Sequence, residues 1–197
     1  MVRFEGGKPK HLPHRAYVLM ALSLVWFPGA PAGAQEETPR GAPKAISEMR
    51  LGVMRHGVHV FVDAEEEGLD VNAEVLFTSP DFMRILLSPR PHLGGSLNTS
   101  GDTSQLYFGL TWDVDLFDPV FFELSFGGAV HDGETNDDGE DQKALGCRVL
   151  FRESLSLGWR FDEHHSLSVM LDHISNAQLC DHNEGLDTLG LRYGYRF

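Results

Sequence analysis

Residues 186–197, the last twelve of the chain, read LDTLGLRYGYRF, and their side chains alternate between apolar and polar. The apolar set is Leu189, Leu191, Tyr193, Tyr195 and Phe197. Glycine and arginine fill the positions between them. Because successive side chains of a β-strand point to opposite faces, this stretch predicts a strand with one apolar and one polar face. A soluble sandwich alternates in the same way, so the composition of the two faces has to decide between the classes.

Residues 147–161 and 165–177 repeat this alternation. The polar faces carry arginine and glycine, which is typical of a small barrel's interior, and the apolar faces end in aromatic residues, as the girdle of a membrane barrel does. The terminal Phe197 is similar to the end of bacterial outer-membrane barrels. We therefore expect an all-β fold, an eight-stranded antiparallel transmembrane β-barrel of the bacterial outer membrane. The predicted strands are Glu48–Val58, Asp70–Asp81, Pro89–Ser100, Gln105–Leu116, Val120–Val130, Leu145–Phe161, His165–Ala177 and Asp187–Phe197.

The predicted connections alternate between short and long, as an up-and-down barrel requires. SPRP (88–91), FDPV (117–120) and DEHH (162–165) are short and predict periplasmic turns. The longer or more polar ones, at 65–70, 98–104, 131–144 and 178–186, predict extracellular loops.

The N-terminus has the three parts of a secretory signal peptide. A basic lead precedes the apolar stretch AYVLMALSLVWFPGA (16–30), and small residues follow at Ala32 and Ala34. We expect cleavage after Ala34, a flexible segment over 35–46 and the barrel over 47–197. The mature chain would keep 12 Lys and Arg against 28 Asp and Glu, a net charge of −16. Such an acidic chain is a poor candidate for binding nucleic acid.

The chain has two cysteines, Cys147 and Cys180. In an exported protein they can form a disulfide, and they can equally be free. The sequence leaves both possibilities open, and the spacing matches no zinc motif.

His173 and Ser175 share the apolar face of their predicted strand, together with Leu171. Asp187 has the matching parity on the next strand, so a hairpin would bring it beside His173. This arrangement suits acyl transfer, with Ser175 as nucleophile, His173 as general base and Asp187 fixing the imidazole. Asn176 is the candidate oxyanion donor, although its parity points inward. The alternative is that these polar residues merely lie among lipid headgroups, where polar side chains are tolerated.

The stretch HISNA (173–177), with Asn183, Gly185 and the terminal YRF, resembles the lipid A 3-O-deacylase family, the PagL-type outer-membrane hydrolases. Residues 88–105 are similar to an upstream block of that family. The resemblance implies an eight-stranded barrel that removes the ester-linked 3-hydroxyacyl chain of lipid A. It also implies that Ser175, His173 and Asp187 form the triad. The family type has Glu at the acid position, so Glu184 in the adjacent loop is the alternative acid.

We expect no metal or cofactor. The ten histidines show no ligand spacing such as HExxH, and the acidic stretch 132–141 lacks the terminal Glu of a calcium loop. The expected substrate is lipid A within lipopolysaccharide, in the outer membrane, and a homodimer is possible. Two other functions stay open: a non-catalytic structural or adhesive barrel, and a phospholipase-like esterase.

Overall fold

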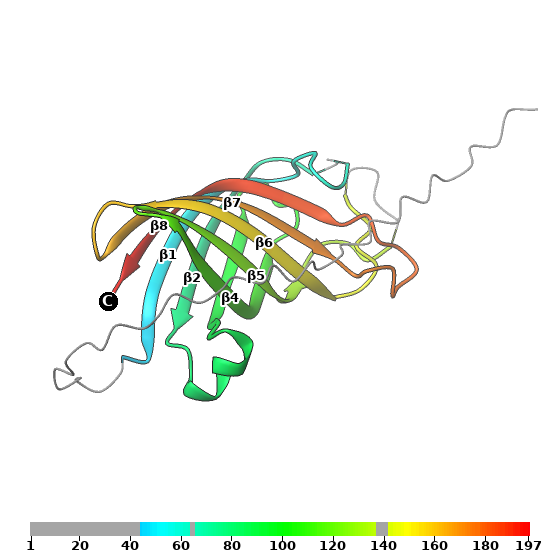
Figure 1. Ribbon diagram of the computed structural model, residues 1–197. Coiled ribbons are helices and arrows are strands. Elements are labelled where there is room, and N and C mark those ends of the chain that lie inside the picture. Colours follow the sequence, from blue (N-terminus) through cyan, green and yellow to red (C-terminus); the bar gives the residue numbers. More distant parts are fainter. Residues whose placement is uncertain (1–43, 64–65, 137–141) are drawn as a thin grey trace, which may run out of the picture. The chain divides into compact units, whose positions relative to one another are not determined.

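The computed structural model describes residues 44–63, 66–136 and 142–197, and these form a closed antiparallel barrel of eight strands (Figure 1). Each strand pairs with its neighbours in sequence, and β8 closes the barrel by pairing with β1. The predicted signal peptide and most of the predicted flexible segment lie outside the described residues. The strands are β1 (Ile46–Arg55), β2 (Leu69–Phe77), β3 (Arg90–Asn98), β4 (Gln105–Phe117), β5 (Val120–His131), β6 (Val149–Arg160), β7 (His165–Ser175) and β8 (Leu186–Arg196).

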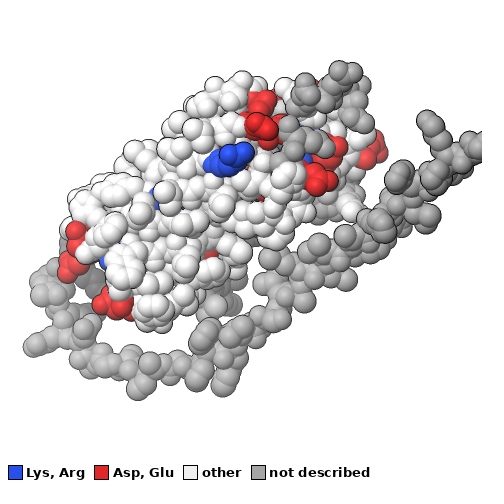
Figure 2. Space-filling model, turned by 90° about the horizontal axis from the view of Figure 1, so that it is seen from above, with Lys and Arg blue, Asp and Glu red and all other residues white. Residues whose placement is uncertain are grey.

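The alternating pattern separates an apolar outer wall from a charged interior. On β8, Leu191 is 54% exposed whereas its neighbour Arg192 is 1% exposed. Figure 2 shows the visible wall as mostly uncharged, with acidic residues gathered toward its two ends. The expected membrane barrel, with its apolar face turned outward, is therefore confirmed. Among the described residues, no helix is long and apolar enough to cross a membrane.

Ion pairs fill the interior. Arg50 pairs with Glu48 at 2.6 Å, with Glu74 at 3.1 Å and also with Glu123. Arg192 reaches Glu74 at 3.0 Å and Glu123 at 3.4 Å. Because each of these side chains is almost fully buried, the pairing offsets the large free-energy penalty of removing charge from water.

The connection between β2 and β3 is longer than predicted. Where a short turn was expected at 88–91, β2 ends at Phe77 and a 3₁₀ helix follows, η1 (Asp81–Leu86). Pro80 precedes this helix in an extended conformation, and its carbonyl accepts a hydrogen bond of 2.9 Å from the Met83 N–H. The indole of Trp112 on β4 donates a hydrogen bond of 2.8 Å to the Leu86 carbonyl, which ties η1 to the barrel. A 3₁₀ helix of six residues is too short to show a hydrophobic periodicity in the sequence.

Two predicted strands that flank the site are shorter than expected. β6 begins at Val149 rather than Leu145, after Gly146 adopts a φ of +80°. β7 ends at Ser175 rather than Ala177, because Ala177 and Gln178 adopt φ values of 52° and 64°. These left-handed conformations leave the strand ladder, so Ser175 stands at the very end of its strand.

Four loops gather at one end of the barrel, on the right in Figure 1. We call their described parts L1 (56–63 and 66–68), L2 (99–104), L3 (132–136 and 142–148) and L4 (176–185), and they alternate with the connections at the opposite end. Cys147 of L3 and Cys180 of L4 form a disulfide, with Cα atoms 6.1 Å apart. The structure thus decides the question that the sequence left open.

Candidate active site

His173 and Ser175 lie on the outer face of β7, near the end that carries the four loops. The burial pattern of β7 alternates along the strand, with Ser168, Met170 and Asp172 buried and the positions between them open. His173 keeps 19% of its side chain exposed. The expectation that both residues point away from the barrel axis is therefore met by the structure.

Asp187 of β8 is the carboxylate that contacts His173. The two residues are direct partners in the β7–β8 register, and His173 Nδ1 lies 2.6 Å from Asp187 Oδ1. A carboxylate can only accept, so Nδ1 carries the proton and Nε2 is free to act as a base. This is the tautomer that a general-base histidine requires.

Loop L1 holds the other oxygen of Asp187. The backbone N–H groups of Val60, Phe61 and Val62 donate to Asp187 Oδ2 at 3.3, 2.6 and 3.1 Å. The ring of Phe61 also meets the His173 ring edge-on, with centroids 5.6 Å apart. L1 therefore buries Asp187 completely, despite its outward parity, and satisfies the charge with oriented dipoles. We call these three consecutive N–H donors the nest. Sequence reasoning missed the nest because backbone N–H groups leave no pattern in side chains.

Ser175 lies two residues closer to the loops than His173, on the same face of β7. Its partner across the β6–β7 ladder is Phe151. Within the described part of the chain its hydroxyl makes no hydrogen bond, including to His173. Nucleophile and base often come into hydrogen-bonding contact only when substrate binds, so the pair remains suited to acyl transfer.

Asn176 and Glu184 have structural partners in the loops. The Asn176 amide nitrogen donates to the Leu145 carbonyl at 2.8 Å and to the His182 carbonyl, joining L3 to L4. Its backbone N–H donates to Asn183 Oδ1 at 2.7 Å. Glu184 accepts a hydrogen bond from the Ala144 N–H. Of the two candidate acids, Asp187 is the one that the structure places on His173.

Glu153 is a site residue that the sequence reasoning did not identify. It faces outward on β6 and is the direct partner of His173 in the β6–β7 register. Its position between Phe151 and Leu155 on a lipid-facing strand was the available signal, because a carboxylate there is unfavourable unless it has a use. His173 thus stands between two acidic side chains, and its hydrogen bond goes to Asp187.

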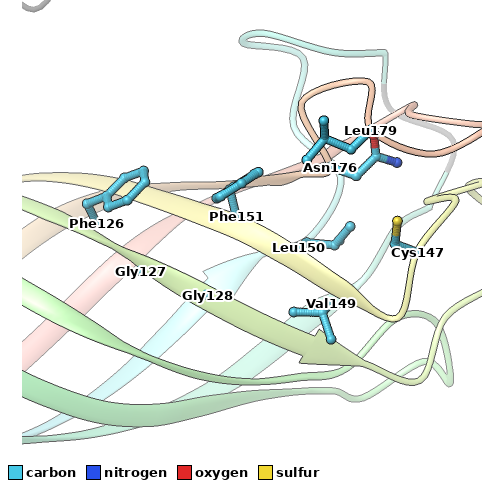
Figure 3. A pocket seen from close by; sticks show the side chains of 9 residues that line it. All are labelled: Phe126, Gly127, Gly128, Cys147, Val149, Leu150, Phe151, Asn176 and Leu179. Atoms are coloured by element: carbon cyan, nitrogen blue, oxygen red, sulfur yellow. The ribbon is translucent and has the colours of Figure 1, made fainter.

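A shallow apolar groove runs along the outer wall, and Figure 3 shows the residues that line it. Its volume is about 250 Å³, and its lining residues are Phe126, Gly127, Gly128, Cys147, Val149, Leu150, Phe151, Asn176 and Leu179. Gly128 faces outward between larger side chains, so its missing side chain deepens the groove. Phe126 and Phe151 stack along one side, with ring centroids 6.3 Å apart. Phe151 is the ladder partner of Ser175, and Asn176 follows Ser175 in the chain, so the groove lies next to the candidate nucleophile without being lined by it.

The described residues lack the ligand set of a metal site. Within 44–63, 66–136 and 142–197, no three His, Cys, Asp or Glu side chains are arranged to hold a metal ion.

Comparisons with known proteins bear on the fold and on the family of the chain. The crystal structure of the outer membrane enzyme PagL superimposes with a TM-score of 0.55 at 18% identity, covering 77% of this chain and 100% of that one. Ail of Yersinia pestis in a phospholipid bilayer nanodisc gives a TM-score of 0.45 at 11% identity, covering 78% of this chain and all of Ail. No curated protein sequence matches the chain. The profile of the family described as "Lipid A 3-O-deacylase (PagL)" matches residues 84–196, the segment that carries His173, Ser175 and Asp187. The chain therefore belongs to the lipid A 3-O-deacylase (PagL) family of outer-membrane barrels.

Proposed function

We propose that the protein is an outer-membrane esterase that hydrolyses the 3-O-linked hydroxyacyl chain of lipid A. The observation that carries the proposal is the hydrogen-bonded His173–Asp187 pair on the outer wall, with Ser175 on the same face. Family membership supports the substrate. An acyl ester in the outer leaflet would meet these groups without leaving the membrane.

The reaction follows from the roles of the three side chains. Ser175 Oγ attacks the ester carbonyl carbon while His173 Nε2 accepts the hydroxyl proton. Asp187 stabilises the imidazolium that results, and the imidazolium then gives its proton to the departing sugar oxygen. Water, deprotonated by His173, hydrolyses the acyl-enzyme, which releases a free 3-hydroxy fatty acid and restores Ser175.

The turn after Ser175 supplies candidate groups for the oxyanion. Asn176 buttresses this turn through its bonds to L3 and L4. The backbone N–H groups of Ala177 and Gln178, held at positive φ, have no acceptor among the described residues. Fixed donors of this kind stabilise the charge of a tetrahedral intermediate, and losing one typically lowers kcat by about 10²–10³-fold.

The groove beside Ser175 suits the acyl chain itself. Its lining is apolar and lies on the lipid-facing wall, so a hydrocarbon chain can enter it directly from the bilayer. Each methylene removed from water contributes about 0.8 kcal/mol, but a chain that moves from lipid into the groove gains less. We expect the groove to orient the chain more than to supply affinity.

The test is a mass spectrum of lipid A from cells that express the wild-type chain or Ser175→Ala. Wild type should lower the lipid A mass by one 3-hydroxyacyl group, and Ser175→Ala should leave it unchanged while still folding into a heat-modifiable barrel. Release of fatty acid from phospholipid with intact lipid A would indicate the phospholipase alternative. Unchanged lipid A and phospholipid would indicate a non-catalytic barrel.

A further inference from the structure

A buried histidine closes the base of loop L1, away from the triad. His56 Nε2 lies 2.9 Å from Glu66 Oε2, and its Nδ1 lies 2.9 Å from Asp70 Oδ1. All three side chains are about 1% exposed. Both ring nitrogens face carboxylates, which can only accept, so both must carry a proton. His56 is therefore an imidazolium clasped between two acids.

The cluster of His56, Glu66 and Asp70, which we call the clasp, joins three of the four loops. Glu66 accepts hydrogen bonds from the Thr103 N–H and hydroxyl in L2, at 3.1 and 3.0 Å, and from the Lys143 N–H in L3, at 3.0 Å. Asp70, at the start of β2, accepts from Asn98 Nδ2 at 3.0 Å. Beside this cluster the Glu67 N–H donates to Asp102 Oδ2 at 3.2 Å, and Lys143 of L3, whose N–H bonds to Glu66, is itself a buried cationic residue.

The same clasp shapes the segment that binds the triad acid. Gly57, directly after His56, adopts a φ of +58°, and a Cβ there would lie 1.8 Å from the Glu66 carbonyl oxygen. The chain then continues to Val58, whose N–H donates to the Asp187 carbonyl at 3.0 Å. The N–H groups of Val60, Phe61 and Val62 follow at Asp187 Oδ2. Both ends of the nest-forming segment are thus fixed, one by Asp187 and one by His56.

We propose that His56 is a positioning residue for the triad: by clasping Glu66 and Asp70 it holds L1 in the shape that binds Asp187 and packs Phe61 against His173. The proposal rests on the proposed esterase function. His56 touches no substrate, so its loss acts on the rate of the chemical step rather than on lipid binding.

The protonation of His56 gives this role a pH dependence. Burial opposes the charged ring, but the hydrogen bonds from His56 to Asp70 and Glu66 prevail and raise the pKa of His56 from 6.5 to about 9. Because the folded pKa lies above the ordinary value, the stabilisation is fully present below about pH 6.5 and is lost as the pH rises through about 9.

The experiment compares wild type, His56→Gln and Glu66→Gln with His164→Gln, which removes an exposed histidine at the opposite end of the barrel. The purified full-length mature protein is assayed on lipid A in detergent micelles from pH 6 to 10, and amide hydrogen exchange is followed over residues 57–63. Both clasp variants should lower kcat roughly tenfold to a hundredfold with KM little changed, and exchange over 57–63 should accelerate. The difference in kcat between wild type and the clasp variants should become smaller above about pH 9, where His56 of the wild type loses its proton. His164→Gln should have the kcat of wild type at every pH.

Wild-type kcat in both clasp variants, or unchanged exchange over 57–63, would overturn the positioning role. Two clasp variants are used because, if one of them does not fold, the other still tests the proposal. If wild-type protein leaves lipid A intact, the esterase proposal itself fails, which is a different outcome from equal activity in wild type and variants.

Discussion

Asp187 illustrates how one residue can combine outward parity with complete burial. Its strand position directs the carboxylate toward lipid, where an exposed charge would be unfavourable. Three L1 amides and the His173 ring satisfy its two oxygens, and L1 excludes lipid and water. The carboxylate can therefore orient the imidazole without being solvated itself.

Replacing this carboxylate should impair catalysis more than folding. Asp187→Asn keeps the shape but turns an NH₂ group toward either the L1 amides or the protonated His173 Nδ1, so donor faces donor. We expect kcat to fall by roughly 10²–10⁴-fold, measured as hydroxy fatty acid released per enzyme. Glu184→Gln should keep near wild-type kcat, because Glu184 bonds to the Ala144 N–H instead of His173. A large fall in kcat for Glu184→Gln together with near wild-type kcat for Asp187→Asn would identify Glu184 as the acid.

At the scale of secondary-structure elements, L3 and L4 are fastened to each other beside Ser175. The Cys147–Cys180 disulfide and the Asn176 amide bridge the same two loops. Cys147, Asn176 and Leu179 also line the groove. The geometry of the turn after Ser175 thus depends on cross-links between loops as well as on the strands.

Removing the disulfide should loosen these loops while the barrel persists. The bridge closes a sequence separation of 33 residues, and disulfides of this kind typically contribute about 2–4 kcal/mol. We expect Cys147→Ser combined with Cys180→Ser to lose esterase activity faster on heating, and a reductant to have the same effect on wild type. The reductant should not affect the double variant, which serves as control. Equal heat-inactivation rates in all samples would show that the bridge does not support the site.

The groove on β5 and β6 offers a second test at this scale. A Cβ at Gly128 would lie 3.6 Å from the Leu150 carbonyl oxygen and from Phe108 Cζ, which is ordinary van der Waals contact. Gly128→Val should fill the groove and lower kcat for long-chain esters by roughly tenfold, because an acyl chain that cannot enter the groove is oriented less well toward Ser175. Hydrolysis of a water-soluble short-chain ester is the control and should not change. An unaltered kcat for the long-chain ester would exclude the groove as the acyl subsite.

At the scale of the whole molecule, paired charges fill the interior of the barrel. Arg192 is paired with Glu74 and Glu123 and donates to Ser156 at 2.9 Å. Arg192→Leu leaves both carboxylates short of a partner and should lower the free energy of unfolding by about 3–5 kcal/mol. Arg84→Leu, which removes an exposed pair with Asp81, should change it by about 0–1 kcal/mol. Urea unfolding in lipid vesicles measures both, and equal effects would refute a stabilising interior network.

The barrel was predictable from sequence because side-chain alternation is a local property of each strand. The parity of Leu171, His173 and Ser175 gave the outward face directly, and the β7–β8 hairpin then placed Asp187. The nest could not be predicted, since Val60 and Asp187 are 127 residues apart and meet only once the barrel closes. The Cys147–Cys180 pairing and the η1 insertion likewise depend on contacts or turn geometry with no periodic signal.

The most direct test is to locate the reactive serine with a fluorophosphonate probe. Intact protein in detergent is labelled and digested, and the modified residue is identified by tandem mass spectrometry, in wild type, Ser175→Ala and Asp187→Asn. A lipid-facing triad predicts one adduct, on Ser175, absent from Ser175→Ala and much slower to form in Asp187→Asn. Lipid A hydrolysis that persists in Ser175→Ala, with no adduct on Ser175 in wild type, would contradict it.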